Sequence, residues 1–295
     1  MKIINFGSLN VDNVYQVPSI VRPGETIAAK SLMINPGGKG ANQSVALARA
    51  GAHVWQAGMV GQDSEWLKDS LAKQGVDVRH VIISPNSHGG HAIIQVDDDG
   101  QNSIVIYGGA NQEIPTSHIG VVLADAHPGD WLTLQNEINL TPELMKAGKA
   151  AGMNICFNPA PMTDSVRDYP LDCVDLFIVN EIEAAELAAR STTVDMEDII
   201  RELAELFSDS MICVTLGEDG ALFWSAATDL LRQPAFATRV VDTTAAGDTF
   251  VGYFLHEISR GTPPAEAMAF ACKAAAITVS RPGASQSIPT RDEVK

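Results

Sequence analysis

The chain has 295 residues, and its hydrophobic content of 45% is sufficient for a large buried core. Its 36 acidic residues outnumber its 20 basic ones, which gives a formal net charge of −16. Such a charge argues against binding to nucleic acid or to an anionic membrane surface, because both partners select a basic face.

Cysteine usage and the start of the chain bear on where the protein works. The four cysteines, Cys156, Cys173, Cys213 and Cys272, are scattered and form no CxxC pair. We therefore expect reduced, mostly buried thiols in a cytoplasmic protein. The first residues lead directly into a strand-like segment rather than a signal peptide, and no uninterrupted apolar segment is long enough to cross a bilayer.

The first predicted strand, residues 2–7, is followed closely by Asn10 and Asp12. Open parallel sheets bind their ligands beyond the carboxyl ends of the strands, so both side chains are candidate ligand contacts. A polar turn explains them equally well. Residues 13–35 then contain short apolar pieces interrupted by prolines, which predict β structure outside a βαβ unit.

Residues 36–43 form a glycine-rich loop that contains Gly38, Lys39 and Asn42 and leads into a predicted helix. The helix is expected to stop at Gly51, a residue type common just after a helix C-terminus. The loop matches neither the P-loop nor the dinucleotide fingerprint. A glycine turn with one lysine also commonly connects two elements without any role in ligand binding.

Two alternating segments within residues 91–107 flank an acidic turn and predict a β-hairpin. Together with residues 13–35, this hairpin is expected to form a small antiparallel sheet. The sheet would project from a main domain made of residues 1–12, 36–90 and 108–295. Such a flap could close over a substrate and exclude water.

From residue 119 onward, strand-like and helix-like segments alternate regularly. Strands are predicted near residues 131–134, 155–157, 176–179 and 211–216. This alternation predicts an α/β fold with an open, mostly parallel sheet and helices on both faces.

Residues 242–250 lead from an apolar segment into another predicted helix. The small residues Ala245, Ala246 and Gly247 allow close approach to the backbone, and the N–H groups at the helix start favour an anion such as phosphate. Asp248 falls in the first helical turn, where its carboxylate could take a proton from a hydroxyl attacking phosphorus. Asp is also a favoured N-cap residue, so a purely structural role is the alternative.

Eight residues are predicted at or just beyond the carboxyl ends of strands, which is one edge of an open α/β sheet. They are Asn10, Asp12, Glu137, Asn158, Asn180, Thr215, Gly217 and Asp248. Each alone is explained at least as well by a turn. Eight at one edge favour a ligand site.

Six motifs in a fixed order carry a family resemblance that covers nearly all of the chain. They are GSLNVD (7–12), PGET (23–26), GGKGANQ (37–43), NPAP (158–161), NEIE (180–183) and DTTAAGDTF (242–250). Because of these motifs, the chain resembles the ribokinase-like sugar kinases, also called the PfkB carbohydrate kinase family. Within this family it most resembles the ribokinases. The resemblance implies transfer of the γ-phosphoryl group of ATP to a hydroxyl of a small sugar, D-ribose first, with Mg²⁺ and, as a monovalent activator, K⁺.

The resemblance also implies roles for individual residues. Asp248 would be the general base, and Ala245, Ala246 and Gly247 would form the anion hole. The residues expected to hold the sugar are Asn10, Asp12, Gly38, Lys39, Asn42 and Glu137. Those expected to line the nucleotide site are Asn180, Thr215, Gly217, Gly220, Gly247 and Cys272. Glu183 would organise Mg²⁺ through water. The expected K⁺ positions, some through backbone carbonyls, are Asp242, Thr244, Thr278, Arg281, Gly283 and Ser287.

Two positions depart from the family pattern. Cys272 stands where ribokinases tend to carry His or Asn near the adenine, and Thr244 replaces a common Ile.

The β flap would be the family's lid, which in many members also forms a homodimer interface.

Three hypotheses follow. The first is a ribokinase-like pentose kinase, and the second is the same fold acting on fructose, deoxyribose or a nucleoside such as adenosine. The third is a catalytically silent sensor of sugar or nucleotide, because a fold resemblance by itself does not prove activity. Retention of Asp248, the small-residue loop and Glu183 argues against the sensor.

Overall fold

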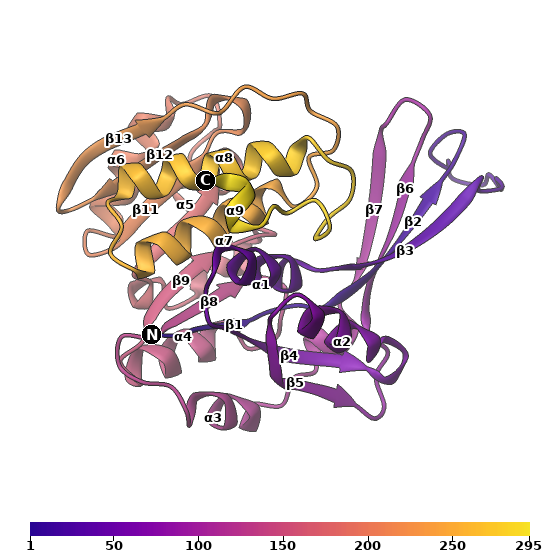
Figure 1. Ribbon diagram of the computed structural model, residues 1–295, viewed down its shortest axis with the longest axis horizontal. Helices are drawn as coiled ribbons and strands as arrows, with labels where there is room; N and C mark the ends of the chain where they lie inside the picture. Colours follow the sequence, from indigo (N-terminus) through magenta and orange to yellow (C-terminus); the bar gives the residue numbers. More distant parts are fainter.

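The computed structural model describes residues 1–295 and contains a nine-stranded sheet in the order β13-β12-β11-β10-β9-β8-β1-β4-β5 (Figure 1). All neighbouring strands are parallel except at one edge, where β12 is antiparallel to both β11 and β13. The strands of this sheet are β1 (Ile3–Phe6), β4 (Val54–Gly61), β5 (Asp77–Ser84), β8 (Trp131–Gln135), β9 (Asn154–Asn158), β10 (Leu176–Asn180), β11 (Met211–Thr215), β12 (Ala221–Ser225) and β13 (Thr228–Gln233).

Helices cover both faces of the sheet, and two separate hydrophobic clusters assign each helix to a face. One cluster contains side chains of α3 (Ser117–Leu123), α4 (Thr141–Ala150), α5 (Glu181–Leu187) and α6 (Met196–Leu206). The other contains side chains of α1 (Lys39–Ala50), α2 (Trp66–Lys73), α7 (Ala246–Ser259), α8 (Pro264–Val279) and α9 (Arg291–Val294). Strand β1 contributes Ile4 and Phe6 to the first cluster and Ile3 to the second, as the alternation of a buried strand requires. The predicted α/β fold is confirmed.

A second sheet of four strands, in the order β3-β2-β6-β7, stands out from this body (Figure 1). Its strands are β2 (Asn10–Gln16), β3 (Ser31–Gly37), β6 (Gly90–Val96) and β7 (Asn102–Tyr107). The pairs β2–β3 and β6–β7 are antiparallel, whereas the central pair β2–β6 is parallel. Asn10 and Asp12 therefore lie on the first strand of the small sheet, not in a loop after β1 as the sequence suggested.

Close backbone packing brings the N-terminal ends of α1 and α7 together over the carboxyl end of β1. A Cβ atom on Gly40 would lie 2.5 Å from the backbone of Gly7 and Ser8, and one on Gly252 would lie 2.4 Å from the Ala46 Cβ. Only glycine fits at either position. The predicted stop of α1 is also seen, because Gly51 follows the helix in a left-handed conformation with φ of 103°.

Several local features differ from the sequence-based expectations. Strands β5, β12 and β13 were not predicted. The cysteines agree with the expectation, since all four are free and three are buried, with Cys173 half-buried. None of the helices combines the length and apolarity needed to span a membrane.

Candidate active site

Asp248 lies in the first turn of α7, and its carboxylate is held by two amides from α1. Asn42 Nδ2 donates to Asp248 Oδ2 at 3.1 Å, and Gln43 Nε2 donates to Oδ1 at 3.1 Å. Both oxygens of the carboxylate thus accept a hydrogen bond from the same helix. The packing of α1 against α7 consequently fixes where this carboxylate lies.

The start of α7 presents free backbone donors. Ala245, a non-glycine residue, has a left-handed φ of 61°, and the N–H groups of Gly247 and Asp248 find no acceptor in the protein. A Cβ built on Gly247 would meet no atom within 4 Å. An exposed helix start with unpaired N–H groups suits an anion. The structure places Ala245, Ala246 and Gly247 around this point, directly beside the Asp248 carboxylate.

Asp12, Glu137 and Asp248 bring three negative charges close together on the side of the small sheet. Burial, together with the nearby Glu137 and Asp248 carboxylates, raises the pKa of Asp12 to about 6. Burial likewise raises the pKa of Glu137, which accepts hydrogen bonds from Ser8 Oγ and, at 3.2 Å, from the Lys39 N–H.

The Lys39 ammonium balances this negative charge. Burial acts to lower the pKa of Lys39, but the carboxylates of Asp248, Glu137 and Glu183 outweigh burial and raise it overall. The lysine therefore stays protonated. A polar site with one cation among several carboxylates offers both donors and acceptors to a polyhydroxy ligand.

Two asparagines complete this side of the site. Asn10 is buried, and its Oδ1 accepts a hydrogen bond of 2.8 Å from Asn111 Nδ2. Gly38, with φ of 92°, crosses close to Asn10, since a Cβ there would lie 3.0 Å from the Asn10 nitrogen. Asn42 Oδ1 is buried without any hydrogen-bond partner. Such an orphaned acceptor is uncommon in folded proteins and is available to a ligand hydroxyl.

A cavity of about 230 Å³ continues from Asp248 toward the ends of β9 and β10, and Lys39, Asn158, Asn180, Glu183 and Thr215 line it. Asn180 caps α5 by accepting from the Glu183 N–H at 2.8 Å, and Glu183 Oε2 accepts from the Asn180 N–H at 3.0 Å. Asn158 Nδ2 lies 3.4 Å from the same carboxylate oxygen. Burial raises the pKa of Glu183.

A larger cavity of about 760 Å³ adjoins the first, since both include Thr215, Thr243, Ala246 and Gly247 in their walls. Gly217, Gly220 and Cys272, predicted for a nucleotide site, also line it, whereas Asn180 lines only the smaller cavity. The remaining wall is mainly apolar and includes Phe236, Val240, Phe250, Ala275 and Val279. Its size falls in the range of sites for small organic ligands. Burial raises the pKa of the Cys272 thiol to about 12, so this residue contributes a neutral surface.

Comparison with known proteins decides the family. The model of the pfkB family carbohydrate kinases matches residues 1–291. The chain belongs to this family. The sugar kinase is 36% identical to the ribokinase of Haemophilus influenzae over 97% of its own length and 95% of the relative's. It is 33% identical to the deoxyribokinase of Salmonella typhi, over 99% and 97% of the two chains. A solved structure of ribokinase from Arabidopsis thaliana, complexed with ribose and ATP, has a TM-score of 0.89 and 30% identity, and the match covers 99% of the kinase and 97% of that chain.

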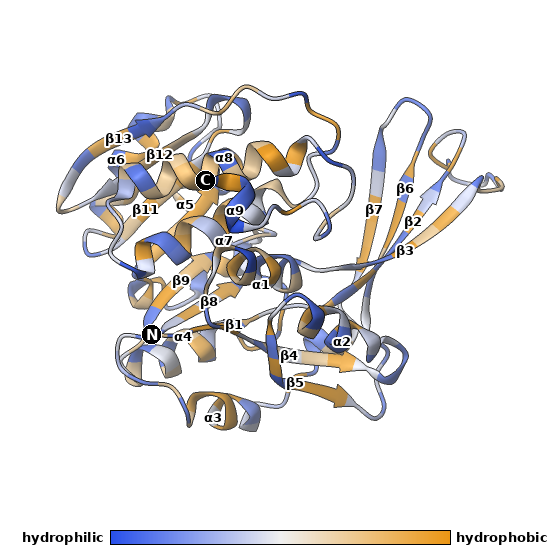
Figure 2. Cartoon of the chain, viewed as in Figure 1, coloured by the Kyte–Doolittle hydropathy of each residue, from blue (hydrophilic) through white to orange (hydrophobic).

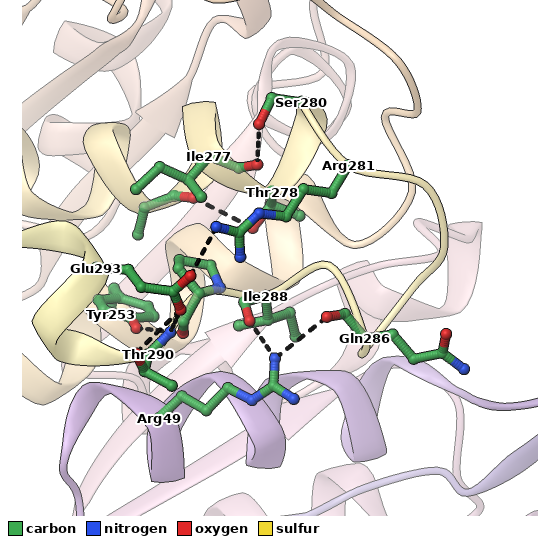
Figure 3. Close-up of polar contacts among 12 residues, drawn as sticks. Arg49, Tyr253, Ile277, Thr278, Ser280, Arg281, Gln286, Ile288, Thr290 and Glu293 are labelled. Carbon is green, nitrogen blue, oxygen red and sulfur yellow. Dashed lines mark hydrogen bonds and ion pairs between the residues drawn. The ribbon is translucent and has the colours of Figure 1, made fainter.

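The loop that precedes α7 in the kinase is tied to the loop that follows α8. Asp242 Oδ1 accepts from the N–H and hydroxyl of Thr244, at 2.9 and 2.6 Å, and Oδ2 accepts from the Gly283 N–H at 2.9 Å. These hydrogen bonds hold the pKa of Asp242 below its usual value despite partial burial, which acts to raise it. The 281–290 segment is fastened in turn to α1 and α7, where Arg49 donates to the Ile288 carbonyl and the Tyr253 hydroxyl donates to the Pro289 carbonyl at 2.7 Å (Figure 3).

The other side chains expected at a monovalent cation do not converge there. The Thr278 hydroxyl donates to the Ala274 carbonyl at 3.1 Å, and the Ser287 hydroxyl donates to the Ala284 carbonyl at 2.7 Å. Arg281 extends to Glu293, with a nitrogen–oxygen distance of 2.7 Å (Figure 3). A cation beside Asp242 would thus rest on that carboxylate and on backbone carbonyls. No group of three or more His, Cys, Asp or Glu side chains forms a metal site in the kinase.

Sequence reasoning missed a set of buried polar residues that support the site. They are Asn5, Ser8, Gln43, Ser44, Gln56, Asn111 and Gln135, all almost fully buried. A signal was present, because Asn5 and Gln56 interrupt otherwise apolar strands and Gln135 ends one. A buried amide in a central strand needs partners, and here the partners lead to Asp248.

Proposed function

We propose that this kinase transfers the γ-phosphoryl group of ATP to a hydroxyl of D-ribose, giving ribose 5-phosphate, with Asp248 as the general base. The observation that carries the proposal is the position of Asp248. Its carboxylate lies between the charged side chains of Asp12, Lys39 and Glu137 and the larger apolar cavity, next to the unpaired N–H groups of α7. Support also comes from the Haemophilus influenzae relative, a ribokinase, and from the Arabidopsis ribokinase complexed with ribose and ATP.

The arrangement of side chains suits phosphoryl transfer, which requires positioning and charge stabilisation more than covalent catalysis. Asp248 would accept the proton of the attacking hydroxyl, a step worth about 10²–10⁴ in rate for a well-placed base. The Gly247 and Asp248 N–H groups would stabilise charge on the transferring group, each donor contributing roughly 10²–10³. Asn10, Asp12, Lys39, Asn42 and Glu137 would hold the sugar hydroxyls.

Glu183 fits a role near Mg²⁺ because it is the acidic side chain that lines the cavity between Asp248 and the apolar nucleotide cavity. Mg²⁺ commonly keeps several waters and takes one or two carboxylates together with substrate phosphates. When bound, the ion would neutralise phosphate charge. Asp242, with carbonyls of the 278–287 segment, would hold K⁺ beside the anion hole and so orient the loop that carries Ala245.

The small sheet is proposed to be both lid and homodimer interface. Its strands expose apolar side chains, visible as hydrophobic stretches on β3, β6 and β7 in Figure 2. They are Leu32, Met33, Ile34, Ile93, Ile104, Val105, Ile106 and Tyr107. Contiguous exposed apolar surface marks interaction sites. The free cysteines support a reducing compartment, and we expect the enzyme in the cytoplasm.

Deoxyribose is the second candidate substrate, favoured by the Salmonella typhi relative, a deoxyribokinase. The two sugars differ by one hydroxyl. A site built to hydrogen-bond that hydroxyl would reject the sugar that lacks it, because its buried polar groups would be left unpaired.

Rates of ADP release with Mg·ATP would test the substrate across D-ribose, 2-deoxyribose, fructose, other pentoses and adenosine, with and without K⁺. We expect the highest kcat/KM on ribose and stimulation by K⁺. Faster turnover of another compound would retain the phosphoryl-transfer chemistry and replace the substrate. Binding of sugar without turnover of any compound would favour the sensor.

A further inference from the structure

Gln43 is a fully buried amide at the centre of the site. It lies on α1, four residues after Lys39, and its side chain is inaccessible to solvent. Its Nε2 donates to Asp248 Oδ1 at 3.1 Å and to Asn158 Oδ1 at 3.1 Å. Its Oε1 accepts from Gln135 Nε2 at 2.6 Å.

These three bonds use both N–H groups of Gln43 and occupy its buried carbonyl oxygen, because a primary amide has two donors. Gln43 therefore has no N–H group left to offer a substrate. Its neighbour Asn42 differs, since Asn42 Oδ1 is buried and unpaired. The two adjacent amides that contact Asp248 thus have different roles, and that of Gln43 is internal to the protein.

The hydrogen bonds around Gln43 run in one direction, toward the carboxylates. Gln135 donates to Gln43, which donates to Asp248 and to Asn158, and Asn158 Nδ2 lies 3.4 Å from Glu183 Oε2. Behind Gln135, its Nε2 also donates to Asn5 Oδ1 at 3.0 Å. Hydrogen-bond chains of this kind polarise one another in a low-dielectric interior.

The carboxylate that Gln43 contacts lies among other charged side chains. Asp248 faces the acidic side chains of Asp12 on β2, Glu137 after β8 and Glu183 on α5, with Lys39 of α1 as the balancing cation. Like charges at close range repel one another. Hydrogen bonds from neutral amides hold the Asp248 carboxylate in place among them.

We propose that Gln43 is a positioning residue that orients the Asp248 carboxylate and couples it through Asn158 to Glu183. The inference rests on the proposed role of Asp248 as base. Because the Gln43 N–H groups can only donate, Gln43 cannot relay the proton that Asp248 takes up. That proton must leave Asp248 by another route, such as water in the adjoining cavity.

Gln43→Met tests the inference, because methionine matches the length of glutamine but cannot donate. We expect kcat to fall about 10- to 100-fold while KM for the sugar changes less than about threefold, the pattern of a lost transition-state interaction. We also expect the acid limb of the kcat/KM profile to move upward by about one pH unit, since the ionised base has lost a donor.

Ser210→Ala is the matched control. Ser210 is also buried, and its hydroxyl donates to the Val174 carbonyl at 2.6 Å; it precedes β11, at the opposite end of that strand from Thr215. The substitution should reduce stability without moving the acid limb. An unmoved acid limb in Gln43→Met, or an equal movement in Ser210→Ala, would overturn the inference.

Gln135→Met provides a second route if Gln43→Met does not fold. This variant removes the donor to Gln43 Oε1 and should move the acid limb in the same direction but by less; an unchanged limb would count against the proposal. Asp248→Asn distinguishes an error in the proposed base from an error in the role of Gln43. If Asp248→Asn stays active, the proposed base is wrong; if it is inactive while Gln43→Met keeps the normal profile, only the coupling through Gln43 is wrong.

Discussion

At the scale of single residues, the Asp12 carboxylate connects ligand binding with folding stability. Burial raises its pKa to about 6 from the ordinary value of 3.8, and Glu137 and Asp248 add to the effect. The folded protein therefore binds this proton more tightly than the unfolded chain does. The resulting stabilisation is complete below pH 3.8 and is lost as the pH rises through about 6.

We expect Asp12→Asn to increase the free energy of unfolding at pH 7.5 by about 1–3 kcal/mol in the absence of sugar. At pH 4 the difference from the unsubstituted protein should largely vanish. KM for the sugar should rise, because a carboxylate acceptor is lost. Urea unfolding at the two pH values, together with sugar kinetics at pH 7.5, measures both effects. Equal stabilisation at both pH values would show that Asp12 ionises normally.

Some residues of the site could be predicted from the sequence, whereas others could not. Asp248, Lys39 and Glu183 are recognisable because they lie in short motifs with glycine or small neighbours. Gln43 lies within one of those motifs, yet nothing in the sequence distinguishes it from Asn42. The distinction depends on which amide is saturated by Gln135 and Asn158, and these partners are 92 and 115 positions away along the chain.

At the scale of elements, the contact between α1 and α7 determines the geometry of the site. Gly252 of α7 lies against Ala46 of α1, where a Cβ would come within 2.4 Å of the Ala46 Cβ. The two helices can approach this closely only with glycine at the contact. Their N-terminal ends carry Asn42, Gln43 and Asp248, so the spacing of the helices sets the hydrogen bonds to the Asp248 carboxylate.

Gly252→Ala should separate the helices, destabilise the protein by about 1–3 kcal/mol through overpacking, and lower kcat. Gly120→Ala is the control, since Gly120 lies in α3 with no atom within 4 Å of a Cβ. That control should be neutral or stabilise by up to about 1 kcal/mol, as expected for glycine to alanine in a helix. Thermal unfolding and initial rates for both variants check this, and a Gly252→Ala enzyme with unchanged stability and kcat would contradict it.

Some elements were readable from local sequence and others were not. The start of α7 and the stop of α1 at Gly51 follow from residue types that act within one turn. Strands β12 and β13 were missed because they form an antiparallel edge after the regular alternation ends. The parallel pairing of β2 with β6 joins Asn10 to Gly90, and no local rule predicts a contact over that separation.

At the scale of the whole molecule, the small sheet carries exposed apolar side chains that no other element of the chain covers. Val105 is 63% exposed and lies opposite Ile93 on β6. Because side chains alternate along a strand, Val105 is on the face away from Asp12, which shares a face with Ala92 and Ile106. A charge at Val105 therefore tests association through the outer face without entering the sugar site.

Val105→Asp should shift the proposed dimer toward monomer in light scattering at micromolar concentration, because a buried unpaired charge strongly disfavours an interface. Leu206→Asp is the control, since Leu206 is equally exposed, at 62%, but belongs to α6 in the main body. It should leave the dimer intact. An unsubstituted chain that is monomeric, or equal effects of the two variants, would contradict the proposed interface.

We propose Asp248 as the group that takes the proton of the sugar hydroxyl attacking ATP. The most direct test compares Asp248→Asn with the unsubstituted enzyme in single-turnover formation of ADP from Mg·ATP and D-ribose, with the sugar phosphate identified by ³¹P NMR. We expect a rate at least about 100-fold lower in Asp248→Asn, with sugar and ATP binding retained. A rate within a few-fold of the unsubstituted enzyme would contradict it and assign the base to another group.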